Sequence, residues 1–412
     1  MDTNSFALGY SAGKKKGGVE LNIAYGDTPP EDTTKLWVKT AEPNGVLISP
    51  EVEQTEVEGG ESYYKMRVTL PYKVAYAGCG VVGSKIYIIG GITNDGTGNQ
   101  SSKSVIVYDT EKKTFEVLKD VLGEGIANIC CAVVGTRIYF VGGGASVSTA
   151  SNKIRYFDTV THELVVCNST MPIALYGFAI GAIENSIYIF GGRSGSTFPQ
   201  TAYCYDTVND TYTSLGNAKY VYNGRIVREG SKFFAFGDEG APSYLMCYDV
   251  DTKETTYVNV GTSSKGCAGG ILDGYIYFIG GEYGTTIYRK KTDTYNTGSA
   301  EKLTITTLKK IAQPACATVG NKIYIFGGSD SGSTKIQPTD EVNVYSLASL
   351  AHVVEEGSLY VKPSTEDNIF PVVKTGSMSF EIGVDSVYKG NAEGIGEPVE
   401  AVLYKDGEWV TI

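Results

Sequence analysis

A short pattern that recurs six times constrains the fold of this 412-residue chain more than any other feature. Each copy has a turn, a pair such as Ile-Tyr within a short apolar run, and two glycines or a near equivalent. The copies read GSKIYIIGG, GTRIYFVGG, ENSIYIFGG, GSKFFAFGD, DGYIYFIGG and GNKIYIFGG. Their first glycines, 43 to 52 residues apart, are Gly90, Gly142, Gly191, Gly237, Gly280 and Gly327. A period of this length is typical of one four-stranded blade per repeat.

A second landmark, an aromatic residue usually followed by Asp and a polar turn, comes after the glycine pairs. It reads VYDTEKKTF around Tyr108, YFDTVTHEL around Phe157, CYDTVNDTY around Tyr205, CYDVDTKET around Tyr248 and, more weakly, IYRKKTDTY around Tyr288. Asp at this place favours the turn that joins two outer strands. In a run such as IYIIGG, Ile and Tyr point to opposite faces of a strand. Both faces are therefore apolar, as expected where each blade lies between two others.

Six glycine pairs, each followed by such a hairpin, resemble the kelch repeat family over roughly residues 62 to 347. The resemblance implies an all-β chain whose residues 59–347 form a six-bladed kelch-type β-propeller. The family usually has Trp at the outer bulky position of the hairpin. Here the outer residues are Phe115, Leu164, Tyr212, Thr255 and Tyr295. Phe, Leu and Tyr fill similar volume, so we interpret most of these changes as packing drift, with Thr255 as the poorest fit.

The sequence also predicts how the ring closes. The sixth repeat lacks an outer strand after Tyr345, whereas the run ESYYKMRVTLP stands before the first repeat without a partner. We therefore expect residues 63 to 70 to complete the last blade. Such a joint removes two exposed sheet edges.

Composition excludes several classes of protein. The formal net charge of −11 argues against nucleic-acid binding by phosphate neutralisation. The 51 glycines and 30 tyrosines favour strands and turns over a helical bundle. The basic run 14–16 follows the first apolar stretch, the reverse of a secretory signal, and no apolar run reaches membrane-spanning length. We therefore expect a protein made in the cytoplasm, with reduced thiols and no membrane insertion.

The residues of an enzyme site are largely missing from the sequence. Copper oxidases of the galactose oxidase type need two histidine ligands at one metal, and His162 and His352 are predicted to lie far apart. Cys79, Cys131 and Cys316 each precede a repeat glycine by 11 residues, so we interpret them as small apolar fillers of the innermost strands. Neither a phosphate-binding loop nor a Ser-His-Asp arrangement stands out. We predict no enzyme activity, no cofactor and no metal site.

The two flanks lie outside the repeats. Residues 1–58 are predicted to be a docking segment that begins with a short helix at 3–16, ended by Gly17 and Gly18. Residues 348–412 contain short strands separated by Gly, Asn and Asp turns, which predicts a small β domain.

Three flanking segments carry a second resemblance. FALGYSAGKKKGG, AYGDTPPEDTTKLWVKT and EAVLYKDGEWVTI look like segments of structural proteins from phages and prophages of Gram-positive, Clostridia-like bacteria. This resemblance implies a virion protein, either a tail or head fibre. It also implies attachment to other virion proteins through residues 1–58 and 348–412. A homo-oligomer is expected, since many soluble assemblies are symmetric. Virions assemble in the cytoplasm, in agreement with the missing export signal.

The loops of the propeller supply the candidate binding residues. Loops after the glycine pairs are rich in Ser, Thr, Asn and Gly, and they reach the same side of a propeller as the loops that enter the innermost strands. Tyrosines beside short polar side chains suit carbohydrate recognition, although loops are also polar because they face water. The candidates in the entering loops, which we align at an equal offset from the repeat glycines, are Tyr76, Asn128, Tyr176, Tyr222, Lys265 and Gln313. Those after the glycines are Asn94, Asp95, Arg193, Asp238, Glu282, Tyr283 and Asp330.

Two hypotheses follow from the sequence. In the first, the flanks attach the chain to a virion and the propeller face binds a host-surface glycan or protein. In the second, the chain is a purely architectural virion part, such as a capsid decoration or a collar or baseplate subunit. A glycan-degrading propeller enzyme is a distant third.

Overall fold

The computed structural model describes residues 61–347, except for 67, 95–97, 218–220, 238–243, 263, 283, 308 and 331–335. It also describes strands of both flanks. Every regular element among these residues is a β-strand, which confirms the predicted all-β class.

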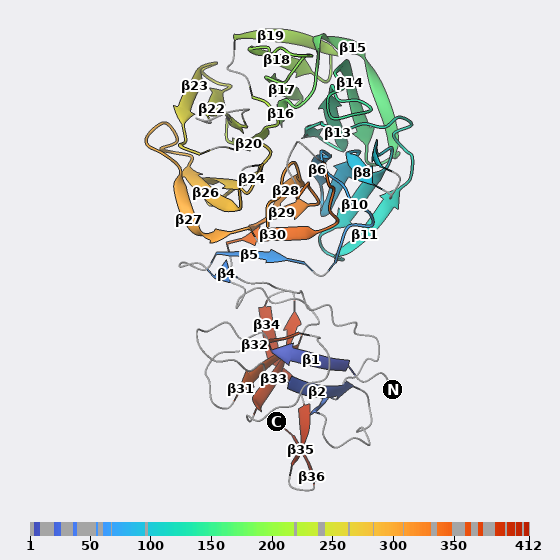
Figure 1. The fold of residues 1–412 in the computed structure, drawn as a ribbon, viewed down its shortest axis with the longest axis vertical. Coiled ribbons are helices and arrows are strands. Elements are labelled where there is room, and N and C mark those ends of the chain that lie inside the picture. Colours follow the sequence, from blue (N-terminus) through green and yellow to red (C-terminus); the bar gives the residue numbers. More distant parts are fainter. Residues whose placement is uncertain are drawn as a thin grey trace. The chain divides into compact units, whose positions relative to one another are not determined.

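Six antiparallel sheets form the blades of a propeller (Figure 1). From the innermost strand outward, blade 1 consists of β6 (Gly78–Val82), β7 (Lys85–Ile89), β10 (Val105–Asp109) and β11 (Thr114–Leu118). Blade 2 consists of β12 (Cys131–Val134), β13 (Arg137–Val141), β14 (Ser151–Asp158) and β15 (Glu163–Leu175). Blade 3 consists of β16 (Ala179–Ile183), β17 (Ser186–Phe190), β18 (Thr201–Asp206) and β19 (Thr211–Asn217).

The other three blades have the same order. They are β20 (Arg225–Glu229), β21 (Lys232–Phe236), β22 (Tyr244–Asp249) and β23 (Thr255–Asn259); β24 (Ala268–Leu272), β25 (Tyr275–Ile279), β26 (Thr286–Lys291) and β27 (Glu301–Thr306); and β28 (Ala315–Val319), β29 (Lys322–Phe326) and β30 (Val342–Ser346), continued by β5 (Ser62–Lys65) and β4 (Thr55–Glu56). A small hairpin, β8 (Ile92–Asn94) and β9 (Asn99–Ser101), stands between β7 and β10.

The hydrophobic core lies between neighbouring blades, as the apolar runs predict. Phe233 and Phe234 are successive residues of β21 and are both fully buried. The ring of Phe233 lies 5.0 Å from that of Tyr188 in blade 3, whereas Phe234 lies 5.3 Å from Tyr295 of blade 5. Alternate side chains of one strand thus pack against two different blades.

The Asp after the hairpin aromatic makes the predicted turn. Asp109 Oδ1 accepts hydrogen bonds from the N–H groups of Glu111 and Lys112, at 3.1 and 3.0 Å. Asp158 and Asp206 bond the turns of blades 2 and 3 in the same way. These side chains satisfy amide groups that the turn leaves without backbone partners.

The ring closes where the sequence predicts. The sheet order of the sixth blade continues from β30 to β5, so residues at the start of the predicted range 63 to 70 complete it. Within the propeller, the N–H of Val74 donates to Thr339 O at 2.9 Å. Tyr108 of blade 1 also packs against Phe326 of blade 6, with ring centroids 5.7 Å apart.

Blade 5 corrects one prediction. Its outer strand is β27, and Tyr295 lies in the long turn before it rather than at the predicted outer position. The Tyr295 ring packs on Phe234 of blade 4, and its hydroxyl is hydrogen-bonded to Thr256 at 2.8 Å. The fixed spacing of the hairpin pattern fails here because this turn is longer than in the other blades.

Strands from both flanks form one nine-stranded sheet. Its strands, in sheet order, are β34 (Gly394–Val399), β33 (Val384–Asn391), β31 (Leu359–Pro363), β32 (Phe370–Val373), β1 (Asn4–Leu8), β2 (Glu20–Tyr25), β3 (Leu36–Val38), β35 (Ala401–Lys405) and β36 (Glu408–Thr411). The proposed division into a segment 1–58 and a domain 348–412 stays a prediction.

The predicted N-terminal helix is wrong at its start. Residues 4–8 form strand β1, which pairs antiparallel with β2 and with β32. Residues 9–16 of the predicted helix lie outside the described residues. A helix-capping pattern involves only a few neighbouring residues. The partner strand β32 lies more than 350 residues further along the chain, so the local pattern carries no information about this pairing.

Asp210 joins blades 2 and 3 and leads to a prediction. Its Oδ2 accepts the N–H of Asn168 at 2.9 Å, and its Oδ1 accepts the N–H of Ser169 at 3.2 Å and the Tyr205 hydroxyl at 2.9 Å. Burial raises the pKa of the Asp210 carboxyl, but these hydrogen bonds outweigh it and hold the pKa below the ordinary 3.8.

We expect Asp210→Asn to lower the free energy of unfolding at pH 7 by about 1–2 kcal/mol, because the half-buried site is partly screened by solvent. A depressed pKa gives stability that is present above the unfolded pKa and is lost as the pH falls through the folded pKa. The difference between the two proteins should therefore shrink below about pH 4. Urea unfolding from pH 7 to pH 3 measures this, and a constant difference would contradict a role for the charge.

Candidate ligand-binding face

The loops predicted to bind meet at one end of the propeller, which we call the loop face. It consists of the connections between the second and third strands of each blade and the connections that enter the innermost strands. Each second strand ends there at its glycine pair. The first glycines adopt positive φ angles, and a Cβ atom on Gly191 would lie 2.3 Å from the backbone of Val221. Glycine is therefore required where the chain turns onto this face.

A closed ring of six backbone hydrogen bonds lies at the centre of the loop face. Each blade contributes one residue, 14 positions before its first glycine, with φ between 50° and 65°. The N–H of each residue donates to the carbonyl oxygen of its equivalent in the preceding blade, with N···O distances of 2.8–3.3 Å. The six are Tyr76, Asn128, Gly177, Asn223, Gly266 and Gln313. All six blades are thus connected through the backbone.

This ring corrects the alignment of the entering loops. Tyr76, Asn128 and Gln313 are ring residues as aligned, whereas Tyr176, Tyr222 and Lys265 each stand one residue before the ring member of their blade. Gly177, Asn223 and Gly266 occupy the equivalent places. All six predicted side chains are buried, with 2–7% of their surface exposed. Their role in ligand binding stays a prediction.

An ion pair is buried among these residues. Lys265 Nζ lies 3.1 Å from Glu282 Oε2, and both side chains are less than a tenth exposed. Burial raises the pKa of the Tyr76 hydroxyl, and the negative charge of Glu282 and the neighbouring Tyr222 phenol raise it further. Glu282 follows the fifth glycine pair, so one candidate from each kind of loop meets here. The pair fixes the end of blade 5 against the ring.

An arginine and three aromatic rings form a second cluster at blades 3 and 4. The guanidinium of Arg193 lies 5.1 Å from the ring centroid of Phe198 and 5.7 Å from that of Tyr222. Phe198 contacts Tyr222 edge-on at 5.4 Å, and Tyr176 lies 6.0 Å from Tyr222. Arg193 Nε also donates to Gly195 O at 2.8 Å. The two residues nearest solvent, Arg193 and Phe198, are each half-buried.

Phe198 was not predicted, although a signal for it exists. Among the loops that follow the glycine pairs, only two contain an aromatic residue, Phe198 in RSGSTFPQT and Tyr283 in EYGT. An aromatic side chain in a polar loop either packs against a neighbour or faces a ligand, and here it covers Tyr222.

The remaining candidates are spread around the face. Asn94 is exposed at the end of β8, with Nδ2 donating to Asn99 Oδ1 at 3.1 Å, and Asp330 is exposed in blade 6. Asp95, Asp238 and Tyr283 lie outside the described residues.

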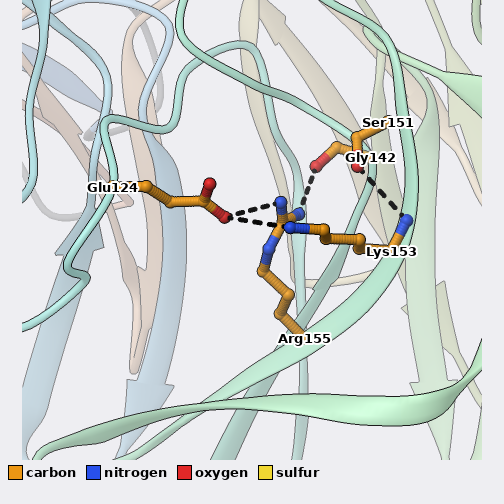
Figure 2. Close-up of polar contacts among 5 residues, drawn as sticks. All are labelled: Glu124, Gly142, Ser151, Lys153 and Arg155. Atoms are coloured by element: carbon orange, nitrogen blue, oxygen red, sulfur yellow. Dashed lines mark hydrogen bonds and ion pairs between the residues drawn. The ribbon is translucent and has the colours of Figure 1, made fainter.

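A polar cluster at the seam of blades 1 and 2 was also missed (Figure 2). Arg155, which is 2% exposed, donates from Nη2 to Glu124 Oε1 at 2.8 Å and from Nη1 to Gly142 O at 3.1 Å. Lys153 Nζ lies 3.9 Å from the same oxygen of Glu124. Glu124 belongs to the loop that leads into ring residue Asn128, so the cluster fixes that loop.

Within the part of the chain that the structure describes, no cluster of three or more His, Cys, Asp or Glu side chains could hold a metal ion. Among those same residues there is no helix with the length and hydropathy needed to cross a membrane.

Comparisons with known proteins agree with the repeats. A family model described as "KLHDC2/KLHL20/DRC7 Kelch-repeats domain" matches residues 76–281, half of the chain, and the "Kelch motif" matches residues 311–349. The chain is 24% identical over 247 residues to Kelch-like protein 25 of Xenopus tropicalis, and 25% identical over 249 residues to Kelch-like protein 25 of Rattus norvegicus. Each match covers 56% of this chain and 42% of the relative, so the chain spans less than half the length of these relatives. The chain belongs to the kelch repeat family.

Proposed function

We propose that the propeller is a non-catalytic binding module that recognises a protein partner through its loop face. The observation that supports this most is the cluster of Arg193, Phe198 and Tyr222, because Arg and aromatic residues carry most of the binding free energy at protein interfaces. A guanidinium can donate hydrogen bonds to a carboxylate or carbonyl of a partner, and a phenylalanine ring beside it adds apolar contact surface.

A glycan ligand is less well supported than the sequence suggested. Tyr176 and Tyr222 are 4% and 7% exposed, so neither offers an open ring face on which a sugar could stack. A protein side chain that inserts beside Phe198 needs less aromatic surface. We therefore favour a protein over a glycan.

The virion role remains a second, finer proposal. It rests on the resemblance of the flanks to phage structural proteins, whereas the two family models match within residues 76–349 and the relatives named above are animal proteins. Attachment through residues 1–58 and 348–412, self-association and location in a virion belong to this proposal. Light scattering on the full chain tests the self-association.

Replacing Arg193 and Phe198 together by alanine is expected to weaken partner binding at least ten-fold. Truncating one such side chain at a protein interface can cost more than about 1 kcal/mol of binding free energy. The measurement compares proteins captured from a host extract by the immobilised native chain and by the variant, with the affinity of each hit then titrated using purified protein.

The matched control changes exposed apolar residues away from the loop face. Val208 and Tyr212 are 70% and 41% exposed at the outer edge of blade 3, so Val208→Ala with Tyr212→Ala removes similar surface. We expect this control to bind like the native chain. Equal binding by the Arg193/Phe198 variant would contradict the proposed face, and binding to a glycan array but to no protein would favour the glycan.

A further inference from the structure

The innermost strands line a partly open cavity of about 110 Å³ at the centre of the propeller. Residues of all six blades line it, and most are small, apolar or thiol-bearing. Arg225, the first residue of β20, has the only formally charged side chain among the described residues that line it. Four thiols share the cavity wall, those of Cys79, Cys130, Cys131 and Cys316. All eight cysteines of the chain are free.

The contacts of Arg225 satisfy hydrogen bonds without neutralising its charge. Its Nη1 donates to Gly224 O at 3.3 Å and lies 3.7 Å from Cys130 Sγ, and its Nη2 donates to Pro314 O. No carboxylate forms an ion pair with Arg225 within the described part of the chain. Carbonyl oxygens and neutral thiols leave a full positive charge in the cavity.

The neighbouring thiols do not supply the counter-charge. Burial raises the pKa of Cys79, Cys130 and Cys131, and it raises the pKa of the nearby Cys267 to about 12. Burial acts to lower the pKa of the Arg225 guanidinium, but the surrounding cysteines outweigh it and raise that pKa. The Arg225 guanidinium is therefore charged at neutral pH, whereas the thiols of Cys79, Cys130, Cys131 and Cys267 are protonated.

Three cations of the propeller that are more deeply buried than the half-buried Arg225 have compensating contacts. Arg155 Nη2 lies 2.8 Å from Glu124 Oε1, and Lys265 Nζ lies 3.1 Å from Glu282 Oε2. Lys290 Nζ donates to Gly298 O at 2.9 Å, and burial lowers the pKa of its ammonium group. The guanidinium of an arginine keeps its charge in proteins. A half-buried charge without a counter-charge costs free energy that a bound counter-ion would remove.

We propose that this cavity binds a small monovalent inorganic anion, such as chloride, beside the Arg225 guanidinium. A volume of about 110 Å³ accommodates such an ion with water. The guanidinium supplies the positive charge that an anion would neutralise, whereas the S–H groups of Cys130 and Cys316 already donate to Gly224 O and Gly269 O, each at 3.5 Å. The site lies among strands of all blades, so occupancy stabilises the closed ring.

Thermal unfolding of the full chain at constant ionic strength tests the site, with sodium chloride replacing sodium gluconate. A ligand that binds only the folded state raises the midpoint temperature with its concentration. We expect the midpoint of the native chain to rise with chloride, and that of Arg225→Met to lose this dependence. The control Arg289→Met removes a half-buried arginine that lies outside the cavity and pairs with Glu301, and it should keep the native dependence. Equal dependence in the native chain and Arg225→Met overturns the proposal.

A second measurement does not require the variant to fold. The ³⁵Cl NMR linewidth of a chloride solution should be broadened by the folded native chain, and added bromide should reverse at least nine-tenths of that excess by competition. Unfolding the chain in urea should abolish it. A folded native chain that causes no excess broadening overturns the proposal whatever the variant does.

Discussion

Replacing Gly327 by alanine is expected to unfold the propeller under conditions in which the native chain is folded. Gly327 has a φ of +60°, and a Cβ atom there would lie 2.1 Å from Val74 O and 3.0 Å from Thr339 O. The left-handed conformation alone costs alanine about 1–2 kcal/mol. The collision also pushes apart the backbone segments that join blade 6 to blade 1, where Gly328 N donates to Val74 O at 2.8 Å. We expect a total loss of more than about 4 kcal/mol.

Gly320→Ala is the matched control for this change. Gly320 has a nearly identical φ of +58°, but a Cβ atom there would meet nothing within 4 Å. Gly320→Ala should therefore lower the free energy of unfolding only by the cost of the left-handed conformation, about 1–2 kcal/mol. Denaturant unfolding followed by circular dichroism measures both losses. Similar losses for the two variants would contradict a rigid closure at Val74.

Replacing Glu282 by glutamine is expected to lower the free energy of unfolding by about 3–5 kcal/mol. The change leaves the Lys265 ammonium buried without its carboxylate partner, 3.1 Å away in the native chain. Because the pair lies beside ring residue Gly266, the loss should also loosen the ring of backbone hydrogen bonds. The backbone N–H of Gln313 donates to Gly266 O, so faster hydrogen exchange of this N–H would show the loosening.

The double variant Lys265→Met with Glu282→Leu separates the charge from the packing. It fills the site with apolar groups of similar size, so we expect it to be more stable than Glu282→Gln alone. Denaturant unfolding of Lys265→Met, Glu282→Leu, their combination and the native chain gives the coupling energy. Additive effects of the two changes would mean that Lys265 and Glu282 do not stabilise one another.

The repeats were predictable because they are local. The glycine pairs, the apolar runs and the Asp turns each involve only a few neighbouring residues, and the patterns recur from blade to blade. A prediction from one blade could therefore be checked against five others. The failure at Tyr295 occurred where one turn is longer and the common spacing no longer applies.

The candidate site was predicted less well because its geometry depends on single positions. An offset of one residue separates Tyr176, Tyr222 and Lys265 from the ring members of their blades. In sequence the correct positions look unrelated, since Tyr, Asn, Gly and Gln all occupy them. What they share is a positive φ, which Gly and Asn adopt more readily than other residues, and one backbone hydrogen bond, which does not depend on the side chain.

The sequence by itself determined the period, the class and the number of blades, and it placed the joint of the ring before the first repeat. These features follow from hydrophobic alternation and turn chemistry, which act between residues close together in the chain. Only the tertiary structure decided that β1 is a strand and that Arg225 stands in the central cavity with no carboxylate partner among the described residues. It also decided that Phe198 covers Tyr222, because such contacts join residues that are far apart in the chain and near in space.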